Sequence, residues 1–489
     1  MKLIYNVQDK PKAGQIVVFA FQQLLAIMAA TIAVPGVVNQ VTGSHMTASA
    51  AMFGAGIGTI VYLLFTKFKS PVFLGSSFAF LGSMFSAFAG AIAMGDENLG
   101  YFGLIIGAAF AGLVYVVLSI IVKFAGVNWI NKIMPAVVIG PTVAIIGLSL
   151  AGNAVGDAVK GGVADASGNA VANPYVAFIC AFVTMVVVVV CSTYGKKMAK
   201  LIPFIIGILA GYAMAVYFTV IGMITNTPSL QIVDFSPFTN LVAGGVGVQT
   251  FISLPQFTFV NAIQGLKSVN PAYIATIAVG FIPVAFVVFA EHIADHKNLS
   301  SIIEKDLLVE PGLSRTLLGD GIGSFAGAVF GGCPNTTYGE SIGCVAITGN
   351  ASIVTILCAA ILAIVVSFLS PVMAFLNSVP PCVMGGVCIT LYGFIAVSGL
   401  KMIQKSDLND NANLFTVSVI LICGVGGLSF TFGDITITTV ASALILGIIT
   451  NLMLKKGRKK EEAAVETKVD EITVDEETAD EVKAEEKAD

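Results

Sequence analysis

Glu340 stands in a polar, glycine-rich stretch, residues 331–343, that interrupts a very apolar region. It is the only charged side chain between Gly321 and Leu400. A carboxylate at bilayer depth costs roughly 2.5 to 3.5 kcal/mol, so it persists there only where it faces protein, a cavity or a ligand. The glycines and Pro334 disfavour a continuous helix, which leaves backbone N–H and C=O groups free to face a ligand. The pattern predicts that Glu340 lies in a binding site; the alternative is a polar loop outside the membrane.

A second carboxylate, Glu291, directly follows a long uncharged apolar run. If this segment is helical, Glu291 and Asp295 lie one turn apart on the same face, close enough to exchange or share a proton. His292 points elsewhere. The alternative is a helix that emerges into the cytoplasm at this point, with residues 295–297 in water.

The pair Glu291 and Asp295 predicts a site that binds and releases a proton. Burial disfavours the charged form of a carboxylate, and a second carboxylate one helical turn away disfavours it further. No basic side chain in the same apolar run neutralises Glu291 and Asp295, so at least one of them is expected to hold a proton near neutral pH. We therefore predict proton coupling at this pair. Sodium is the alternative ion, because carboxylates and free backbone carbonyls also coordinate it.

The composition places these residues in membrane-spanning elements. The mean hydropathy is +0.91, and 56% of the 489 residues are hydrophobic while only 11% are charged. About a dozen apolar runs have the roughly 20 residues that a spanning helix needs. Two more runs, near 71–90 and 335–349, are short and interrupted. The sequence predicts an all-α polytopic membrane protein with fourteen transmembrane segments.

The sequence does not predict a metal site or a catalytic centre. The eight cysteines lie in or beside apolar runs without metal-site spacing and are expected to be packing residues. No His/Cys/Asp grouping has the spacing of a catalytic centre, so no enzyme activity, metal site or cofactor is expected. His45, in an apparent outer loop, is expected to be a surface residue.

The basic residues predict the orientation of the chain. With fourteen spans and a cytoplasmic N-terminus, all of the 25 basic residues except Lys160 and Lys267 fall on the cytoplasmic side or in the tail. The last 29 residues, 461–489, carry 3 basic and 13 acidic side chains and no aromatic residue. Such a segment is expected to be disordered and solvated. Both termini are therefore expected in the cytoplasm.

The two halves of the chain resemble each other. Residues 135–140 (PAVVIG) match residues 381–386 (PCVMGG), and residues 76–78 (SSF) resemble residues 336–338 (TTY). Seven spans per half is an odd number, so the second half enters the membrane with the opposite orientation. Inverted repeats with broken segments in matching places predict a secondary transporter with its site near the bilayer midplane. Chance similarity in glycine-rich apolar sequence is the alternative for either match alone.

Four stretches together carry a resemblance to a known family: residues 74–80 (LGSSFAF), 290–292 (AEH), 334–340 (PNTTYGE) and 381–386 (PCVMGG). The chain resembles the nucleobase–ascorbate transporter family over roughly residues 10–455, and within it the uracil permease branch. The resemblance implies two inverted repeats of seven segments, with short antiparallel strands in segments 3 and 10. It also implies a core domain (segments 1–4 and 8–11) and a gate domain (5–7 and 12–14).

The domain organisation expected on this basis runs along the chain in the following order: a cytoplasmic N-terminus, 1–14; a first repeat, 15–223; an outer loop with an amphipathic helix, 224–270; a second repeat, 271–454; and a basic, then acidic cytoplasmic tail, 455–489. The implied partners are uracil or a related pyrimidine base, a proton or sodium, the lipid bilayer and a second copy in a homodimer. Nucleic acid is not among them.

The resemblance also implies roles for individual residues. Glu291 and Glu340 correspond to the carboxylates that hold the pyrimidine. The backbone around Phe78 and that of Tyr338 and Gly339 would meet the other polar edges of the ring. Uracil alternates N–H donors and carbonyl acceptors, so its buried recognition needs both acceptors and donors. A purine transporter, a sodium-coupled nucleobase transporter and a channel remain alternatives.

The sequence departs from the family pattern at two places. Asp295 stands where some uracil transporters have a histidine, which puts the proton path in doubt. Residues 22–23 are Gln-Gln where those transporters have Gln-His, in a network expected to support the site.

Overall fold

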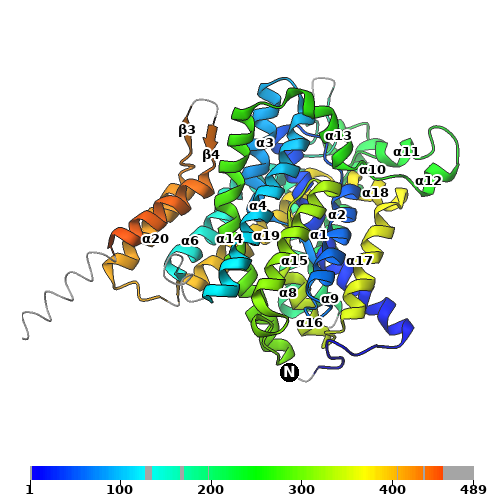
Figure 1. Cartoon of the computed structure of the whole chain (residues 1–489). Helices are drawn as coiled ribbons and strands as arrows, with labels where there is room; N and C mark the ends of the chain where they lie inside the picture. Colours follow the sequence, from blue (N-terminus) through cyan, green and yellow to red (C-terminus); the bar gives the residue numbers. More distant parts are fainter. Residues whose placement is uncertain are drawn as a thin grey trace, which may run out of the picture.

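The computed structural model describes residues 3–126, 135–165, 170–196, 198–404, 406–432 and 435–454. The described part is mainly helical (Figure 1). Eight of its helices are long and apolar enough to cross a bilayer, and four further apolar helices are shorter. These helices agree with the expected polytopic membrane protein. The expected tail, residues 455–489, lies outside the described residues.

The first half of the chain runs from α1 to α10. In order its elements are α1 (Ala13–Thr42), α2 (Ala48–Phe65), β1 (Leu74–Ser76), the 3-10 turn η1 (Phe78–Phe80), α3 (Leu81–Ala93), α4 (Glu97–Ala125), α6 (Ala136–Ser149), α7 (Ala151–Ala158), α8 (Pro174–Tyr194), α9 (Met198–Leu201) and α10 (Pro203–Ile224), where η1 leads directly into α3. A long connection follows, with only short pieces: η2 (Pro228–Leu230), α11 (Ser236–Asn240), α12 (Val248–Phe251), α13 (Thr258–Gly265) and η3 (Leu266–Ser268).

The second half begins with the longest described helix. Its elements are α14 (Pro271–Ile303), η4 (Leu308–Gly312), α15 (Leu313–Gly331), β2 (Asn335–Thr337), α16 (Gly339–Thr348), α17 (Ile353–Ser367), α18 (Ser370–Ser378), α19 (Pro381–Ile403), α20 (Asn411–Val425), β3 (Phe430–Phe432), β4 (Ile435–Ile437) and a last helix, Thr439–Leu454.

The helices pack as two groups. In one group α2, α4, α14, α15 and α17 pack against one another, with α1 and α13 at their sides. In the other group α19 packs against α6, α7 and α8, while α10 packs against α8 and α20 against α6. In Figure 1, α20 lies toward the left of the molecule with α6 next to it, and α17 lies toward the right next to α2.

Glycines let α2 and α15 approach closely. A Cβ on Gly54 would lie 2.5 Å from the carbonyl oxygen of Gly327, and a Cβ on Gly58 would lie 2.7 Å from that of Gly323. Any side chain at these positions would force the two helices apart, so only glycine permits this backbone contact. The close contact matters for the site because β1 follows α2 and β2 follows α15.

The last apolar run differs from a simple span. Hydropathy predicts one helix over residues 433–454, whereas the structure has strand β4 followed by a helix from Thr439. β3 and β4 pair antiparallel, with Phe430 opposite Ile437. Residues 435–438 (ITIT) are all β-branched, which explains the difference, since such residues favour strands over helices. β4 packs against α14.

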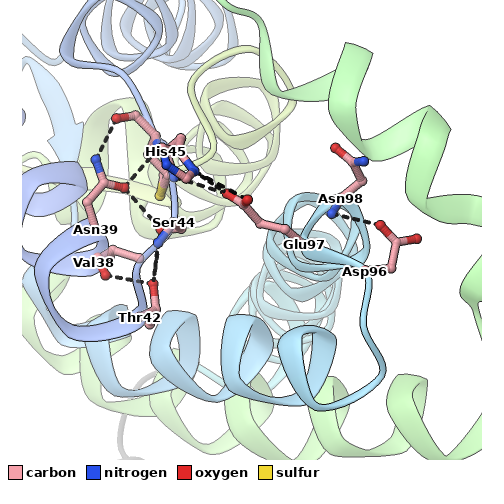
Figure 2. A network of polar contacts seen from close by, with 9 residues as sticks. Val38, Asn39, Thr42, Ser44, His45, Asp96, Glu97 and Asn98 are labelled. Carbon is pink, nitrogen blue, oxygen red and sulfur yellow. Dashed lines mark hydrogen bonds and ion pairs between the residues drawn. The ribbon is translucent and has the colours of Figure 1, made fainter. Parts of the chain in front are cut away.

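A polar network joins the loop between α1 and α2 to the start of α4 (Figure 2). The side chain of Asn39 bonds to both backbone groups of Met46, at 2.7 and 2.8 Å. The Glu97 carboxylate accepts from the backbone N–H of His45 at 3.1 Å and lies 3.0 Å from its Nδ1. The His45 side chain is 80% exposed, as expected for a surface residue. Asp96 caps α4 by accepting from the backbone N–H of Asn98 at 3.0 Å.

Candidate functional site

Two short buried strands bring the two interrupted segments together. β1 and β2 pair antiparallel, with Gly75 opposite Thr336. The pairing extends beyond the strands, where the backbone N–H of Tyr338 donates to the carbonyl of Phe73 at 3.2 Å. Segments that lie about 260 residues apart in the chain thus share one hydrogen-bonded ladder.

Gly75 and Tyr338 are matched in shape across the strands. A Cβ on Gly75 would lie 2.3 Å from the ring of Tyr338, so no other residue fits there without moving the ring. The Tyr338 hydroxyl donates to the carbonyl of Ser76 at 2.8 Å. Tyr338 is therefore held against β1 by both packing and a hydrogen bond.

A helix begins directly after each strand. η1 and α3 follow β1, starting at Phe78, and α16 follows β2, starting at Gly339. The N–H groups of a first helical turn have no partner inside their own helix and carry partial positive charge. Both helix starts line one cavity of about 70 Å³, to which Ser77, Phe78 and Gly339 contribute. This cavity is small, with room for a few water-sized groups.

The two predicted carboxylates lie at this cavity. Glu291 reaches it from α14, and Glu340 reaches it from the first turn of α16. Both side chains are half-buried. The structure thus brings Glu291, Glu340, Phe78, Tyr338 and Gly339 together around one space. Their part in binding stays a prediction.

Asp295 lies on the same face of α14 as Glu291 but has its own partner. Thr337, the last residue of β2, donates through Oγ1 to Oδ2 of Asp295 at 2.7 Å. Asp295 does not line the small cavity but a second one of about 570 Å³, which Glu291 and Glu340 also line. The larger cavity also reaches Lys200, and it adjoins the small cavity, because Glu291, Gly339 and Glu340 line both.

A third cavity adjoins the small one but is lined by neither carboxylate. This cavity of about 640 Å³, lined by Val41 and Asn153 among others, shares only Phe78, Ala79 and Ile146 with the small one. Phe78 packs edge-on against Tyr392 of α19, with ring centroids 6.0 Å apart. Phe78 thus lies where the small cavity meets this one.

Ser341 connects the site to α1. Its hydroxyl oxygen accepts from Nε2 of Gln23 and, at 3.0 Å, from the backbone N–H of Phe73. Gln23 is buried and Ser341 is next to Glu340 in sequence. The second departure from the family pattern therefore lies beside the predicted site, at the junction of α1, α16 and the residue that precedes β1.

The structure also shows three polar residues that sequence reasoning did not assign. His292, His296 and Asp320 are fully buried and hydrogen-bonded between α14, α15 and α2. α14 continues to Ile303, and of residues 295–297, which the alternative placed in water, only Lys297 is exposed. The signal for Asp320 was its charge within an apolar run, one residue before the uncharged region that begins at Gly321.

A family model described as "Permease family" matches residues 14–431 of the chain. The chain belongs to this permease family. The match spans α1 to β3 and includes every site residue named above, and it confirms the family resemblance of the sequence. The permease is a transporter and not an enzyme.

Curated relatives of the permease match over nearly their whole length. The uracil permease of Bacillus caldolyticus is 36% identical over 456 residues, which cover 93% of this chain and 95% of the relative. The uracil permease of Bacillus subtilis is 35% identical, with 94% and 97% covered. The uracil permease of Escherichia coli K12 is 33% identical, with 92% and 94% covered.

Solved structures of low sequence identity share the fold. The transmembrane domain of a cyanobacterium bicarbonate transporter aligns with a TM-score of 0.54 at 14% identity, covering 91% of this chain and 99% of that one. The inward-facing murine Solute Carrier 26 family member A9 anion transporter aligns with a TM-score of 0.60 at 11% identity. The alignment covers 92% of this chain and 70% of that one. At such identity the likeness concerns the fold alone.

Proposed function

We propose that the permease is a secondary active transporter that imports uracil across the cell membrane by proton symport. The observation that carries the proposal is the meeting of Glu291 and Glu340 at one cavity between two helix starts. Two acceptors and two sets of free backbone donors suit a ring that alternates N–H and C=O groups. The relatives named uracil permeases over 92–94% of this chain support the choice of base.

The three carboxylates have different roles toward the substrate and the proton. Glu340 accepts from a ring N–H. Glu291 contacts the ring and, when protonated, donates to a ring carbonyl. Asp295 lies one turn further along α14, at the wall of the larger cavity, and exchanges the proton with Glu291. Because binding and protonation then favour each other, a proton gradient drives uracil accumulation.

The transport cycle follows an alternating-access scheme. The helical group with β1, β2 and α14 acts as the core, and the group with α6, α8, α10 and α19 acts as the gate. Each group takes helices from both of the proposed inverted repeats of seven segments, 15–223 and 271–454, which the outer loop 224–270 joins. Both carboxylates also line the cavity that reaches Lys200, whereas neither lines the cavity beyond Phe78, which supports a conformation open to the side predicted to be cytoplasmic. We place both termini on that side and expect a homodimer.

Radiolabelled uracil uptake into proteoliposomes, in competition with unlabelled bases, tests the substrate. We expect excess uracil to abolish uptake and xanthine or guanine to leave it largely unchanged. Inhibition of uptake by xanthine, with no effect of excess uracil, would replace the proposal with a purine transporter. Flux far above transporter turnover without uphill accumulation would indicate a channel instead.

A further inference from the structure

α14 has a second polar face that lines none of the cavities described above. His292 and His296 lie four residues apart on this face, and their rings stack with centroids 4.0 Å apart. Both side chains are fully buried. Glu291 and Asp295 occupy the neighbouring face and line the larger cavity. The helix therefore presents carboxylates to the cavity and imidazoles to the protein interior.

His292 contacts two side chains of α15. Its Nδ1 lies 2.8 Å from Oδ2 of Asp320, and its Nε2 lies 3.0 Å from Oγ1 of Thr316. The Thr316 hydroxyl donates its own proton to the carbonyl of Leu313 at 3.1 Å, so toward His292 it acts as an acceptor. Nε2 of His292 therefore carries a proton.

One proton must then lie between His292 and Asp320. A contact of 2.8 Å between two groups that otherwise only accept is stable only with a proton between them. The pair is either a neutral imidazole with a protonated acid or an imidazolium with a carboxylate, and its net charge is zero in both forms. Oδ1 of Asp320 has no hydrogen-bond partner among the described residues. This favours the neutral acid, because a buried charged oxygen without a partner costs more than a neutral one.

His296 links the same face to α2. Its Nδ1 donates to the carbonyl of His292 at 2.8 Å, and its Nε2 lies 2.7 Å from the hydroxyl of Tyr62. That hydroxyl is also 2.7 Å from Oγ of Ser70. One direction satisfies every group: Ser70 donates to Tyr62, Tyr62 to His296, and His296 to the carbonyl. All groups in this series of hydrogen bonds are then uncharged.

We infer that His292 and Asp320 are positioning residues for Glu291, and that they hold α14 through one shared proton that stays in the pair. The inference rests on the proposed function, in which Glu291 contacts the substrate. Apolar contacts alone let a helix slide or turn slightly, whereas directed hydrogen bonds to α15 and α2 fix the rotation of α14 about its axis. Since Glu291 and His292 are adjacent, any turn that broke the pair would also move Glu291 relative to Glu340.

Five other titratable groups lie around the pair: Glu291, Asp295 and His296 on α14, Tyr62 on α2 and Tyr115 on α4. Neither His292 nor Asp320 lines a described cavity, so neither is assigned to the substrate.

Two variants of Asp320 separate positioning from proton transport. Asp320→Asn keeps a donor for Nδ1 of His292, because the amide N–H replaces the shared proton. Asp320→Leu keeps the size of the side chain and removes the partner. In purified, monodisperse protein we expect uracil affinity within about threefold of native for the Asn variant and at least about tenfold weaker for the Leu variant. Proton-driven uptake by the Asn variant should keep the native pH profile.

Glu310→Gln is the matched control for the change from acid to amide. The Glu310 side chain is 72% exposed, and its ion-pair partner is Lys69. Lys69 lowers the pKa of Glu310 by hydrogen bonding and by its charge, but an exposed pair contributes little to stability. We expect this variant to match the native protein in affinity, uptake and unfolding.

The pH dependence of unfolding tests the shared proton without any substrate. Above about pH 6.5 an unfolded chain has a neutral histidine and an ionised aspartate, so it lacks the proton that the folded pair holds. The pair's contribution to the free energy of unfolding should therefore fall as pH rises. Because the unfolded chain binds one proton fewer, the unfolding equilibrium constant should rise about tenfold per pH unit from this pair. In Asp320→Asn the histidine is neutral in both states over this range, so this part of the slope should be missing between pH 7 and 9. All other groups are common to both proteins and cancel in the comparison.

Three outcomes would overturn the inference. Equal slopes of stability against pH for the native protein and Asp320→Asn would show that the folded pair holds no shared proton. Native-like affinity in Asp320→Leu would remove the positioning role. Loss of pH-driven uptake in Asp320→Asn with uracil affinity intact would make Asp320 a carrier of the transported proton instead. A native protein that binds no uracil would contradict the proposed function, while the unfolding comparison would still decide on the shared proton.

Discussion

The hydroxyl of Thr337 donates to the carboxylate of Asp295 at 2.7 Å, which ties α14 to strand β2. This contact places one acidic residue of α14 against the strand pair and leaves the other, Glu291, at the small cavity. The two carboxylates therefore have different surroundings although they share a helix face. In the proposed mechanism Glu291 meets the substrate and Asp295 passes the proton toward the larger cavity.

Asp295→Asn tests this division of roles. An asparagine oxygen can still accept from Thr337, so we expect the fold to be retained and uracil affinity to stay within about threefold of native. An amide cannot exchange a proton near neutral pH, so uptake driven by a pH gradient should be lost. Binding and proteoliposome uptake, measured on the same preparation, separate the two effects.

Thr337→Val serves as the matched control, because it removes the donor and keeps both the shape of the side chain and the Asp295 carboxylate. This variant should keep pH-driven uptake. Full pH-driven uptake in Asp295→Asn would remove Asp295 from the proton path and leave Glu291 as the sole candidate.

Glu340→Gln should weaken binding itself. The change replaces one acceptor oxygen with a donor that faces a ring N–H, and both groups are then mispaired in a site with little water. We expect a penalty on the order of 1 to 3 kcal/mol, or about 5- to 150-fold in affinity, measured by equilibrium binding of uracil to the purified variant. Glu310→Gln should bind normally. Near-native affinity of Glu340→Gln would show that this carboxylate does not contact the substrate.

Gly75→Ala should disturb the strand pair. The added Cβ would lie 2.3 Å from the Tyr338 ring, so the ring must leave its place between β1 and the cavity. We expect a loss of stability of about 1 to 3 kcal/mol, seen as a lower unfolding temperature, together with weaker uracil binding. Gly36→Ala, where a Cβ meets nothing within 4 Å, is the control and should be neutral or slightly stabilising. An unchanged unfolding temperature for Gly75→Ala would mean that Tyr338 moves away without cost.

The sequence predicted the cavity-facing residues because each carries a local signal. Glu291 and Glu340 are charges within long apolar runs, and helical spacing places Asp295 on the same face as Glu291. The glycines and Pro334 marked the break that leads into β2. The likeness of residues 76–78 to 336–338 indicated that the two broken segments correspond to each other.

The pair behind the site could not be predicted in this way. Asp320 and His292 are 28 residues apart and belong to different helices, so their contact depends on how α15 packs against α14. That packing in turn depends on the close approach of α15 to α2 at glycines such as Gly58. Hydropathy also could not separate β4 from the helix that follows, because isoleucine and threonine suit either a span or a strand.

The driving ion is the last prediction, and two features favour the proton. The polar side chains that line the small cavity with Glu291 are Glu340 and hydroxyl residues, and the described donor bonded to Asp295 is Thr337. A carboxylate in a low-dielectric site gains from protonation, whereas a bound sodium ion would need several oxygen ligands arranged around it. We expect uracil to accumulate in sodium-free proteoliposomes under an inward proton gradient and to stop accumulating when a protonophore is added.

The experiment needs two arms in which only one gradient is present. In the first, an inward pH gradient is imposed without sodium; in the second, an inward sodium gradient is imposed with the pH gradient and the membrane potential collapsed. Proton symport predicts accumulation in the first arm alone, and Asp295→Asn should abolish it there. Accumulation in the second arm alone would make the permease a sodium symporter, and the same carboxylates would then act as ion ligands, since an ionised pair beside free carbonyls can also hold a cation.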